Sequence, residues 1–253
     1  MSPVRQSVSR WCFSALALDT LAAEARAMGL ESIELLDPPE WAVVARHGLI
    51  CAMANAPAPC TIEKGINRRE SHASLVEAYE ERLRACAAAG VPNLIVFSGN
   101  RCGIDDEQGL DACAEFLRGI AGEAERVGVT LCMELLNSRI DHPDYQCDHT
   151  AWGVELCERV GSERFKLLYD IYHMQIMEGD VIRTIQRAHG CIGHFHTAGN
   201  PGRHEIDDTQ ELNYPAIVRA IRGTGFRGFI GHEFVPRGNP LEALRAAVAT
   251  CAE

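Results

Sequence analysis

The amino-acid sequence predicts a (β/α)8 barrel, or TIM barrel, in which residues 1–253 form a single domain. The first observation is an alternation: a short apolar or β-branched run, a polar turn and an amphipathic stretch follow one another eight times. Strands that alternate with helices in this way form a parallel sheet. The second observation is the length, because about 250 residues is typical of one such barrel. The third is that no linker, low-complexity segment or second compositional zone interrupts the chain.

The eight expected strands are short and rich in aliphatic residues. In the first half of the chain they are SVSRWCFS (7–14), SIELLD (32–37), LICAMAN (49–55) and NLIVFS (93–98). In the second half they are TLCMELLN (130–137), FKLLYDI (165–171), CIGHFHT (191–197) and GFIGHEF (228–234). Runs of this kind are typical of buried parallel strands. An open doubly wound sheet is the alternative, but no GxGxxG motif follows the first strand.

Amphipathic stretches between these runs predict the helices. The clearest cover residues 16–28, 70–89 and 108–127. In the last of these, apolar residues recur at helical spacing at Leu110, Ala114, Leu117 and Ala121. Glycine often follows a helix because it adopts the left-handed conformation without strain. The glycines expected in this position are Gly29, Gly48, Gly90, Gly128 and Gly190.

Composition and charge exclude several classes of function. The formal net charge is −11 and only two of the 24 basic residues are lysines, so we expect no nucleic-acid partner, which would need a basic face. No run reaches the roughly 18 consecutive apolar residues of a membrane span, so we expect no membrane partner. The N-terminal MSPVRQSVSRW lacks the apolar segment of a signal peptide. We therefore expect a cytoplasmic protein whose eleven cysteines are reduced and buried.

Metal-capable side chains lie at the ends of the last four expected strands. They are Glu134, Asp170, His196 and Glu233. In a barrel of this type the catalytic groups come from the carboxyl ends of the strands, so these four should face a common site. Glu34 and Asn55 are weaker members of the same ring. His194 shares the face of His196 one layer deeper and is expected to be a packing or supporting residue, whereas His232 should point away.

An isolated aspartate or histidine at a strand end is usually hydrogen-bonded and has no further role. Three carboxylates buried together would repel one another, however, and a divalent cation removes that repulsion. We therefore expect Glu134, Asp170, His196 and Glu233 to bind one divalent metal ion. Three oxygen donors and one nitrogen suit Mn²⁺ or Mg²⁺, with Co²⁺ or Zn²⁺ as alternatives.

Five segments in the second half of the chain carry a family resemblance: MELLN (133–137), YDIYHMQIMEGD (169–180), IGHFHTAGNPGRHE (192–205), ELNY (211–214) and GHEFVP (231–236). With these segments the chain resembles the hydroxypyruvate isomerase family of the xylose isomerase-like TIM-barrel superfamily. The strings YDIYHMQ and NPGRHE are the specific ones. The resemblance is strong over about the last 120 residues and looser, though colinear, before that.

The resemblance implies roles for individual residues. In the superfamily the positions of Glu134, Asp170, His196 and Glu233 bind the metal. The positions of Glu134 and Glu233 also form the catalytic acid–base pair. The position of His173 contacts a substrate oxygen, and Arg203 is the candidate for the arginine that binds substrate. An ion pair between Arg203 and Glu205 is the alternative for that arginine, and a structural hydrogen bond is the alternative for His173.

The chain departs from the hydroxypyruvate isomerase pattern at His196, and this departure bears on the identity of the substrate. Hydroxypyruvate isomerases resemble this chain in PGRHE but carry glutamine at the position of His196. Ketose 3-epimerases of the superfamily carry histidine there, with an arginine six residues later, where this chain has Gly202. The expected substrate is thus a small oxo-acid or sugar. Hydroxypyruvate, converted to tartronate semialdehyde through an enediolate, is favoured over the substrates of a 2-oxo-tetronate isomerase or ketose 3-epimerase.

Two remoter alternatives are a metal-dependent endonuclease and a non-catalytic sugar-binding barrel. The negative charge disfavours the first, and an intact pair of glutamates disfavours the second. Barrels of this kind often pair, so a homo-oligomer is a further expectation. The walls of the pocket from the first half of the chain are expected among Trp11, Phe13, Asn55, Phe97 and Arg68 or Arg69.

Overall fold

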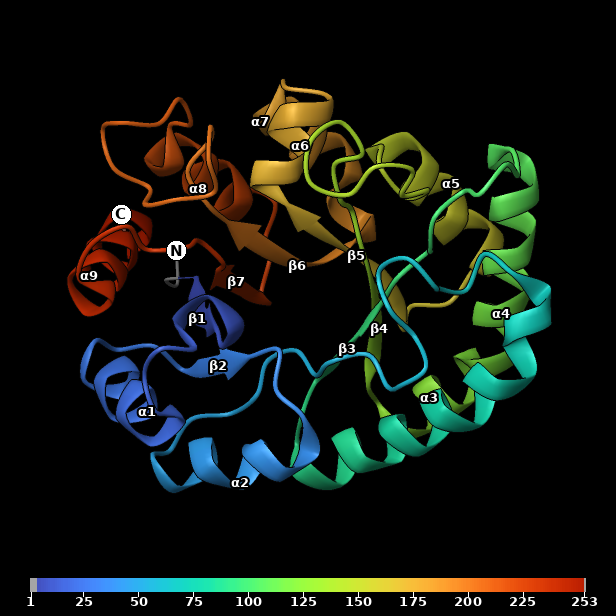
Figure 1. The fold of residues 1–253 in the computed structure, drawn as a ribbon, viewed down its shortest axis with the longest axis horizontal. Helices are drawn as coiled ribbons and strands as arrows, with labels where there is room; N and C mark the ends of the chain where they lie inside the picture. Colours follow the sequence, from blue (N-terminus) through green and yellow to red (C-terminus); the bar gives the residue numbers. More distant parts are fainter. Residues whose placement is uncertain (1–3, 253) are drawn as a thin grey trace.

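The computed structural model describes residues 4–252, and the strands in it form one curled, parallel sheet surrounded by helices (Figure 1). The strand order is β2-β1-β7-β6-β5-β4-β3. The strands are β1 (Arg5–Ser9), β2 (Ser32–Glu34), β3 (Asn93–Val96), β4 (Thr130–Glu134), β5 (Phe165–Asp170), β6 (Ile192–Thr197) and β7 (Phe229–His232). Strands β1 and β7, from opposite ends of the chain, pair in parallel.

The segment expected to be the third strand, residues 49–55, closes the barrel through isolated β-bridges and is not a regular strand. Ile50 and Ala54 bridge in parallel to Ser32 and Leu36 beside β2, and Ala54 also bridges to Leu94 of β3. The Ala54 amide donates to Asn93 O at 2.9 Å. Residues 50–54 therefore connect the two edges of the seven-stranded sheet, and the predicted TIM barrel is confirmed.

The helices cover the outside of the sheet (Figure 1). They are α1 (Leu18–Ala27), α2 (Pro38–Arg46), α3 (Arg69–Ala89), α4 (Asp106–Val127), α5 (Thr150–Val160), α6 (Ile171–Met177), α7 (Val181–Ala188), α8 (Tyr214–Gly223) and α9 (Pro240–Ala252). Helix α4 shows how the sequence specifies them: Asp105 accepts a hydrogen bond from Gln108 N at 2.8 Å at its start, and Gly128 ends it with a φ of 75°. None of the helices between residues 4 and 252 is both long and apolar enough to cross a membrane.

Three local expectations were wrong. The first strand ends at Ser9, because the chain turns into a short 3₁₀ helix, η1 (Trp11–Phe13). Gly190 does not adopt the left-handed conformation after a helix; it lies inside a second 3₁₀ helix, η2 (His189–Cys191). Cys102 is exposed, whereas most of the other cysteines are buried, and all of them are free thiols.

The interior of the barrel has an apolar half and a polar half. Met53, Ile95, Cys132 and Leu168 form a small buried cluster of their own, separate from the main core between sheet and helices. Inward positions on β1, β2, β6 and β7 instead carry polar or small residues. They are Ser7, Ser9, Glu34, His194, His196 and Gly231. The polar half supports the candidate site at the carboxyl ends of the strands.

Candidate active site

The structure brings together the four side chains that the sequence placed at successive strand ends. Glu134 and Asp170 end β4 and β5, His196 lies one residue before the end of β6, and Glu233 directly follows β7. One donor atom from each lies within 4.8 Å of the others, and all four residues are buried. Parallel strands place their carboxyl ends at one rim, which explains why residues nearly 100 positions apart meet here.

His196 lies at the centre of this quartet. Its Nδ1 is 3.2 Å from Glu134 Oε1, 3.1 Å from Glu233 Oε2 and 3.9 Å from Asp170 Oδ2. Burial lowers the pKa of His196, but the surrounding carboxylates, above all Glu233, outweigh it and raise that pKa well above its usual value. The imidazole therefore faces a strongly negative pocket that attracts a cation.

Glu233 is the more strongly hydrogen-bonded of the two candidate acid–base residues. Its Oε1 accepts from Trp11 Nε1 at 2.7 Å and from Ser9 Oγ at 3.2 Å, and its Oε2 forms an ion pair with Arg203. Burial raises the pKa of Glu233, but His196 and Arg203 outweigh it and hold that pKa well below its usual range. The carboxylate of Glu233 is therefore held in the ionised form.

Glu134, at the end of β4, has a different environment from Glu233. Its carboxylate contacts His196, and burial raises its pKa above the usual value. Its backbone oxygen accepts from the hydroxyl of Tyr145 at 3.0 Å, which anchors the end of β4. The two glutamates thus face the same imidazole nitrogen from β4 and from the end of β7, with opposite shifts of pKa.

Asp170 links the quartet to His173 through the start of a helix. Asp170 is the N-cap of α6, and its Oδ1 accepts from the backbone N–H of His173 at 3.1 Å. This capping explains the spacing of the two residues in YDIYH. The other oxygen, Oδ2, is buried without a hydrogen-bond partner, and burial raises the pKa of Asp170 to about 7.

The ring of His173 is held in one tautomer by Asn137. The Oδ1 of Asn137 accepts from the backbone N–H groups of Ile140 and Asp141, so its amide nitrogen faces His173 Nδ1, at 2.6 Å. Nδ1 is therefore the acceptor, and the proton lies on Nε2. That Nε2 is buried with no hydrogen-bond partner, 3.7 Å from Asp170 Oδ2. His173 thus presents a free donor beside the quartet.

Arg203 reaches the quartet from the loop after β6. Its Nη2 contacts Glu233 and lies 3.7 Å from Asp170 Oδ2, and the guanidinium carbon is 5.1 Å from the ring centre of Trp11 and 5.6 Å from that of Tyr172. Its Nε is buried without a partner. Its φ of 58° is strained for a side chain other than glycine and directs the arginine inward.

The alternative pairing of Arg203 with Glu205 does not occur. Glu205 instead accepts from Arg237 Nε at 3.1 Å and from the Arg237 backbone N–H at 2.7 Å.

A cavity of about 350 Å³ opens beside the two glutamates of the quartet, Glu134 and Glu233. It is lined by Trp11, Leu35, Asn55, Ile62, Ile95, Phe97, Glu134, Leu136, His142, Arg203 and Glu233. Three of the expected wall residues, Trp11, Asn55 and Phe97, therefore line it. Phe13 does not, since it is buried against Phe234, and neither do Arg68 and Arg69, which line another surface depression.

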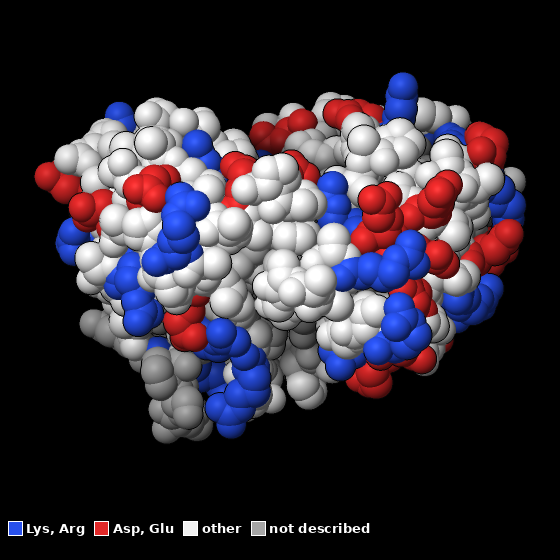
Figure 2. Space-filling view, turned by 90° about the horizontal axis from the view of Figure 1, so that it is seen from below, with Lys and Arg blue, Asp and Glu red and all other residues white. Residues whose placement is uncertain are grey.

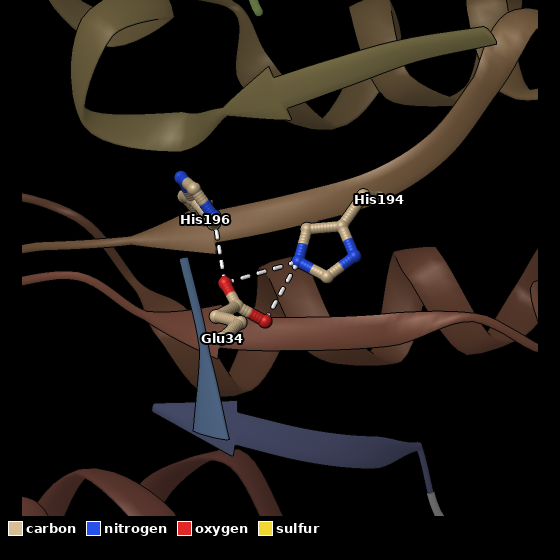
Figure 3. Close-up of side chains that lie close together, drawn as sticks. All are labelled: Glu34, His194 and His196. Carbon is tan, nitrogen blue, oxygen red and sulfur yellow. Dashed lines mark hydrogen bonds and ion pairs between the residues drawn. The ribbon is translucent and has the colours of Figure 1, made fainter. Parts of the chain in front are cut away.

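Several residues at the site carried little signal in the sequence. Ser9 is a small polar residue in an otherwise ordinary strand, and His142 lies in a loop with no motif. Asn137 ends the MELLN segment, but no feature of the sequence assigned it a contact with His173. Glu34 was expected in the ring at the mouth, but it lies beside and below His196, with Oε1 at 2.7 Å from His196 Nε2 and 3.1 Å from His194 Nε2 (Figure 3). His194, expected to be a packing or supporting residue, is buried and its Nε2 contacts the Glu34 carboxylate.

The donor set fits a divalent cation. With the three carboxylates ionised and His196 neutral, as ligands of an ion would be, Arg203 balances one of the three negative charges and a divalent ion would balance the other two. The unpartnered Asp170 Oδ2 is the acceptor that such an ion would satisfy. Oxygen donors with one imidazole are a ligand set that proteins use for divalent metal ions.

Comparisons with known proteins agree with this architecture. A family model described as xylose isomerase-like TIM barrel matches residues 22–252. A putative hydroxypyruvate isomerase of Homo sapiens is 31% identical over 268 residues, covering 96% of this chain and 94% of that protein. A 2-oxo-tetronate isomerase of Haemophilus influenzae is 28% identical over 242 residues, covering 90% of this chain and 91% of that protein.

The fold also matches a solved structure over nearly its whole length. A crystal structure described as AP endonuclease, family 2, from Brucella melitensis superposes with a TM-score of 0.84 at 28% identity, covering 96% of this chain and 97% of that one. From the family match and the full-length relative, the chain belongs to the xylose isomerase-like TIM-barrel family and, within it, to the hydroxypyruvate isomerase family.

Proposed function

We propose that this protein is a metal-assisted isomerase that moves a proton between adjacent carbons of a small oxo-acid or ketose. The favoured reaction converts hydroxypyruvate to tartronate semialdehyde. The observation that carries the proposal is the pair of carboxylates, Glu134 and Glu233, which approach the same nitrogen of His196 within 3.2 Å at the floor of a cavity. Two carboxylates so placed can act on adjacent carbons of one small molecule.

The reaction needs one group that removes a proton and another that returns one. Hydroxypyruvate loses a proton from C3 to give an enediolate, and the enediolate gains a proton at C2. The hydroxyl proton on the C3 oxygen moves to the C2 oxygen, and tartronate semialdehyde results. Glu134 and Glu233 would perform the two steps at carbon, one from each side of the substrate. A divalent ion bound by Glu134, Asp170, His196 and Glu233 would supply Lewis-acid stabilisation of the enediolate oxygens.

Two free donors would bind and orient the substrate. The Nε2–H of His173 is buried and unpartnered, so it can donate to a substrate oxygen. The unpartnered Nε of Arg203 can donate to a substrate carboxylate, and a guanidinium is suited to that group because its N–H donors are planar and fixed. Trp11 and Phe97 would exclude water from the cavity that they line.

The descriptions of the relatives support a small oxo-acid as the substrate but do not distinguish hydroxypyruvate from a 2-oxo-tetronate. One is described as a putative hydroxypyruvate isomerase and another as a 2-oxo-tetronate isomerase, and both would need a carboxylate-binding group such as Arg203. The 2-oxo-tetronate reaction is therefore the second candidate.

Endonuclease activity is named in the description of one structural relative. Against it, the net charge of this chain is −11. Basic and acidic side chains are also interspersed on the face drawn in Figure 2.

The proposal is tested by assaying the purified protein after chelation and after addition of Mn²⁺ or Mg²⁺. We expect metal-dependent conversion of hydroxypyruvate, with deuterium from D₂O appearing at the carbon that receives the proton. A panel containing a 2-oxo-tetronate, a neutral ketose and duplex DNA with an abasic site separates the alternatives. Equal turnover of hydroxypyruvate with and without metal would contradict the proposed mechanism.

A further inference from the structure

Beneath the quartet, Glu34 forms a buried triad with His194 and His196. Figure 3 shows the Glu34 carboxylate, at the end of β2, directed at both imidazoles of β6. Its Oε1 lies 2.7 Å from His196 Nε2, and both of its oxygens lie 3.1 Å from His194 Nε2. All three side chains are fully buried. Glu34 is therefore in contact with the quartet through His196, and it does not line the cavity.

We propose that Glu34 is a positioning residue that fixes the tautomer and orientation of His196, so that Nδ1 presents its lone pair to the metal ion. This inference rests on the proposed metal site. An ionised carboxylate can only accept hydrogen bonds, so His196 Nε2 carries the proton that it donates to Glu34. The other nitrogen, Nδ1, faces Glu134, Asp170 and Glu233, so a bound ion would take the place of a proton on Nδ1 and use its lone pair. A carboxylate that accepts from a ligand imidazole also increases the basicity of that imidazole.

The surroundings hold Glu34 in this arrangement. The inward position of β7 beside it is Gly231, and a Cβ there would lie 2.0 Å from Glu34 Oε1. Glycine thus leaves the space that the carboxylate occupies. The imidazole nitrogens of His194 and His196 both lie within hydrogen-bond distance of the carboxylate, so two donors hold it in place. His194 supplies a second donor that prevents the carboxylate from rotating away.

A second cation between Glu34, His194 and His196 is the competing interpretation. The distances of 2.7 and 3.1 Å between the carboxylate and the imidazole nitrogens are those of direct hydrogen bonds. An ion there would also need Nε2 of His196 without its proton, while Nδ1 binds the first ion. The geometry therefore favours a hydrogen-bonded support over a second metal site.

The test measures Mn²⁺ affinity by calorimetry in the wild-type protein and in three variants. Glu34→Ala removes the acceptor, and we expect a dissociation constant up to about 100-fold higher; Glu34→Gln keeps a neutral acceptor and should lose about tenfold. Gly231→Ala leaves every charge in place but displaces the carboxylate, so it should also weaken binding. Ser7→Ala is the matched control, because Ser7 pairs with Gly231 in the same buried layer and its hydroxyl has no partner.

A second readout separates positioning from general stability. In the Zn²⁺-loaded protein, which is diamagnetic, the His196 Nε2–H proton should be shifted strongly downfield and exchange slowly with water in the wild type, and it should lose both features in Glu34→Ala, which removes the acceptor 2.7 Å away. Thermal melting of the metal-free variants shows whether each is folded; a Glu34→Ala protein that fails to fold leaves Glu34→Gln and Gly231→Ala to decide. The inference is overturned if the folded variants bind Mn²⁺ within twofold of the wild type. Two ions per wild-type chain would also overturn it, and no ion at all would overturn the proposed function as well.

Discussion

Replacing Asp170 with asparagine should stabilise the metal-free protein while removing its activity. Asp170 is fully buried, and one of its oxygens has no hydrogen-bond partner. Asparagine has nearly the same shape, and its oxygen can still accept from His173 N at the start of α6. The substitution therefore removes a buried charge and retains the helix cap.

The size of the effect follows from the pKa of Asp170. Burial raises that pKa from 3.8 to about 7 in the folded chain. At about 1.4 kcal/mol per unit, the ionised carboxylate costs on the order of 4 kcal/mol of folding free energy. Below pH 4 the Asp170 carboxyl is protonated in both the folded and the unfolded chain, so it costs no folding free energy. Stability of the metal-free wild type is then lost as the pH rises from about 4 to 7, and the advantage of Asp170→Asn should grow over the same range and level off above it.

The assay is denaturant unfolding of the chelated proteins between pH 4 and pH 8. Asp148→Asn is the matched control, for which we expect the opposite change in stability. Burial raises the pKa of Asp148, but hydrogen bonds from Arg101, Ser138 and His149 outweigh it and lower that pKa, so asparagine there should destabilise at pH 8. Saturating Mn²⁺ should reduce the difference in unfolding free energy between wild type and Asp170→Asn. The wild type binds the ion more tightly and is therefore stabilised more by it. An Asp170→Asn protein that is less stable than the wild type at pH 8 without metal would refute the reasoning.

Three further substitutions test the proposed chemistry. Glu134→Gln and Glu233→Gln should each lower kcat by about 100-fold or more in a protein that remains folded, and near wild-type turnover in either would rule out a mechanism that uses both carboxylates. Arg203→Ala should raise KM about 10- to 100-fold for a carboxylate-bearing substrate and less for a neutral ketose, so equal losses would argue against a carboxylate clamp. Asn137→Ala frees the His173 ring and should lower kcat/KM by about tenfold, measured across the pH range, whereas an unchanged profile would show that His173 needs no support.

The fold was readable from the sequence because strand and helix periods alternate so regularly. The bounds expected for the long helices near 70–89 and 108–127 nearly match α3 and α4, since caps and glycines mark their ends. The early strands were less predictable. SVSRWCFS continues as an apolar run past Ser9, but Arg10 adopts a helical conformation and η1 begins at Trp11. The turn after Ser9 cannot be predicted from the local composition. It is this turn that brings the Trp11 side chain into contact with Glu233.

The candidate site was predictable to the extent that it follows strand ends. Glu134, Asp170, His196 and Glu233 could be named because each ends or follows a strand and the fold brings those ends together. The supporting contacts depend on register and on loop paths. Only the pairing of β2 with β1, and of β1 with β7, places Glu34 against Gly231 and beneath His196. Likewise, the contact between Asn137 and His173 depends on how the loop after β4 folds back.

The most direct test of the account is anomalous diffraction from a crystal of the Mn²⁺-loaded protein. The account predicts one manganese peak per chain, bound by carboxylate oxygens of Glu134, Asp170 and Glu233 and by Nδ1 of His196. A peak bound elsewhere, or no ordered manganese at concentrations that support turnover, would contradict it.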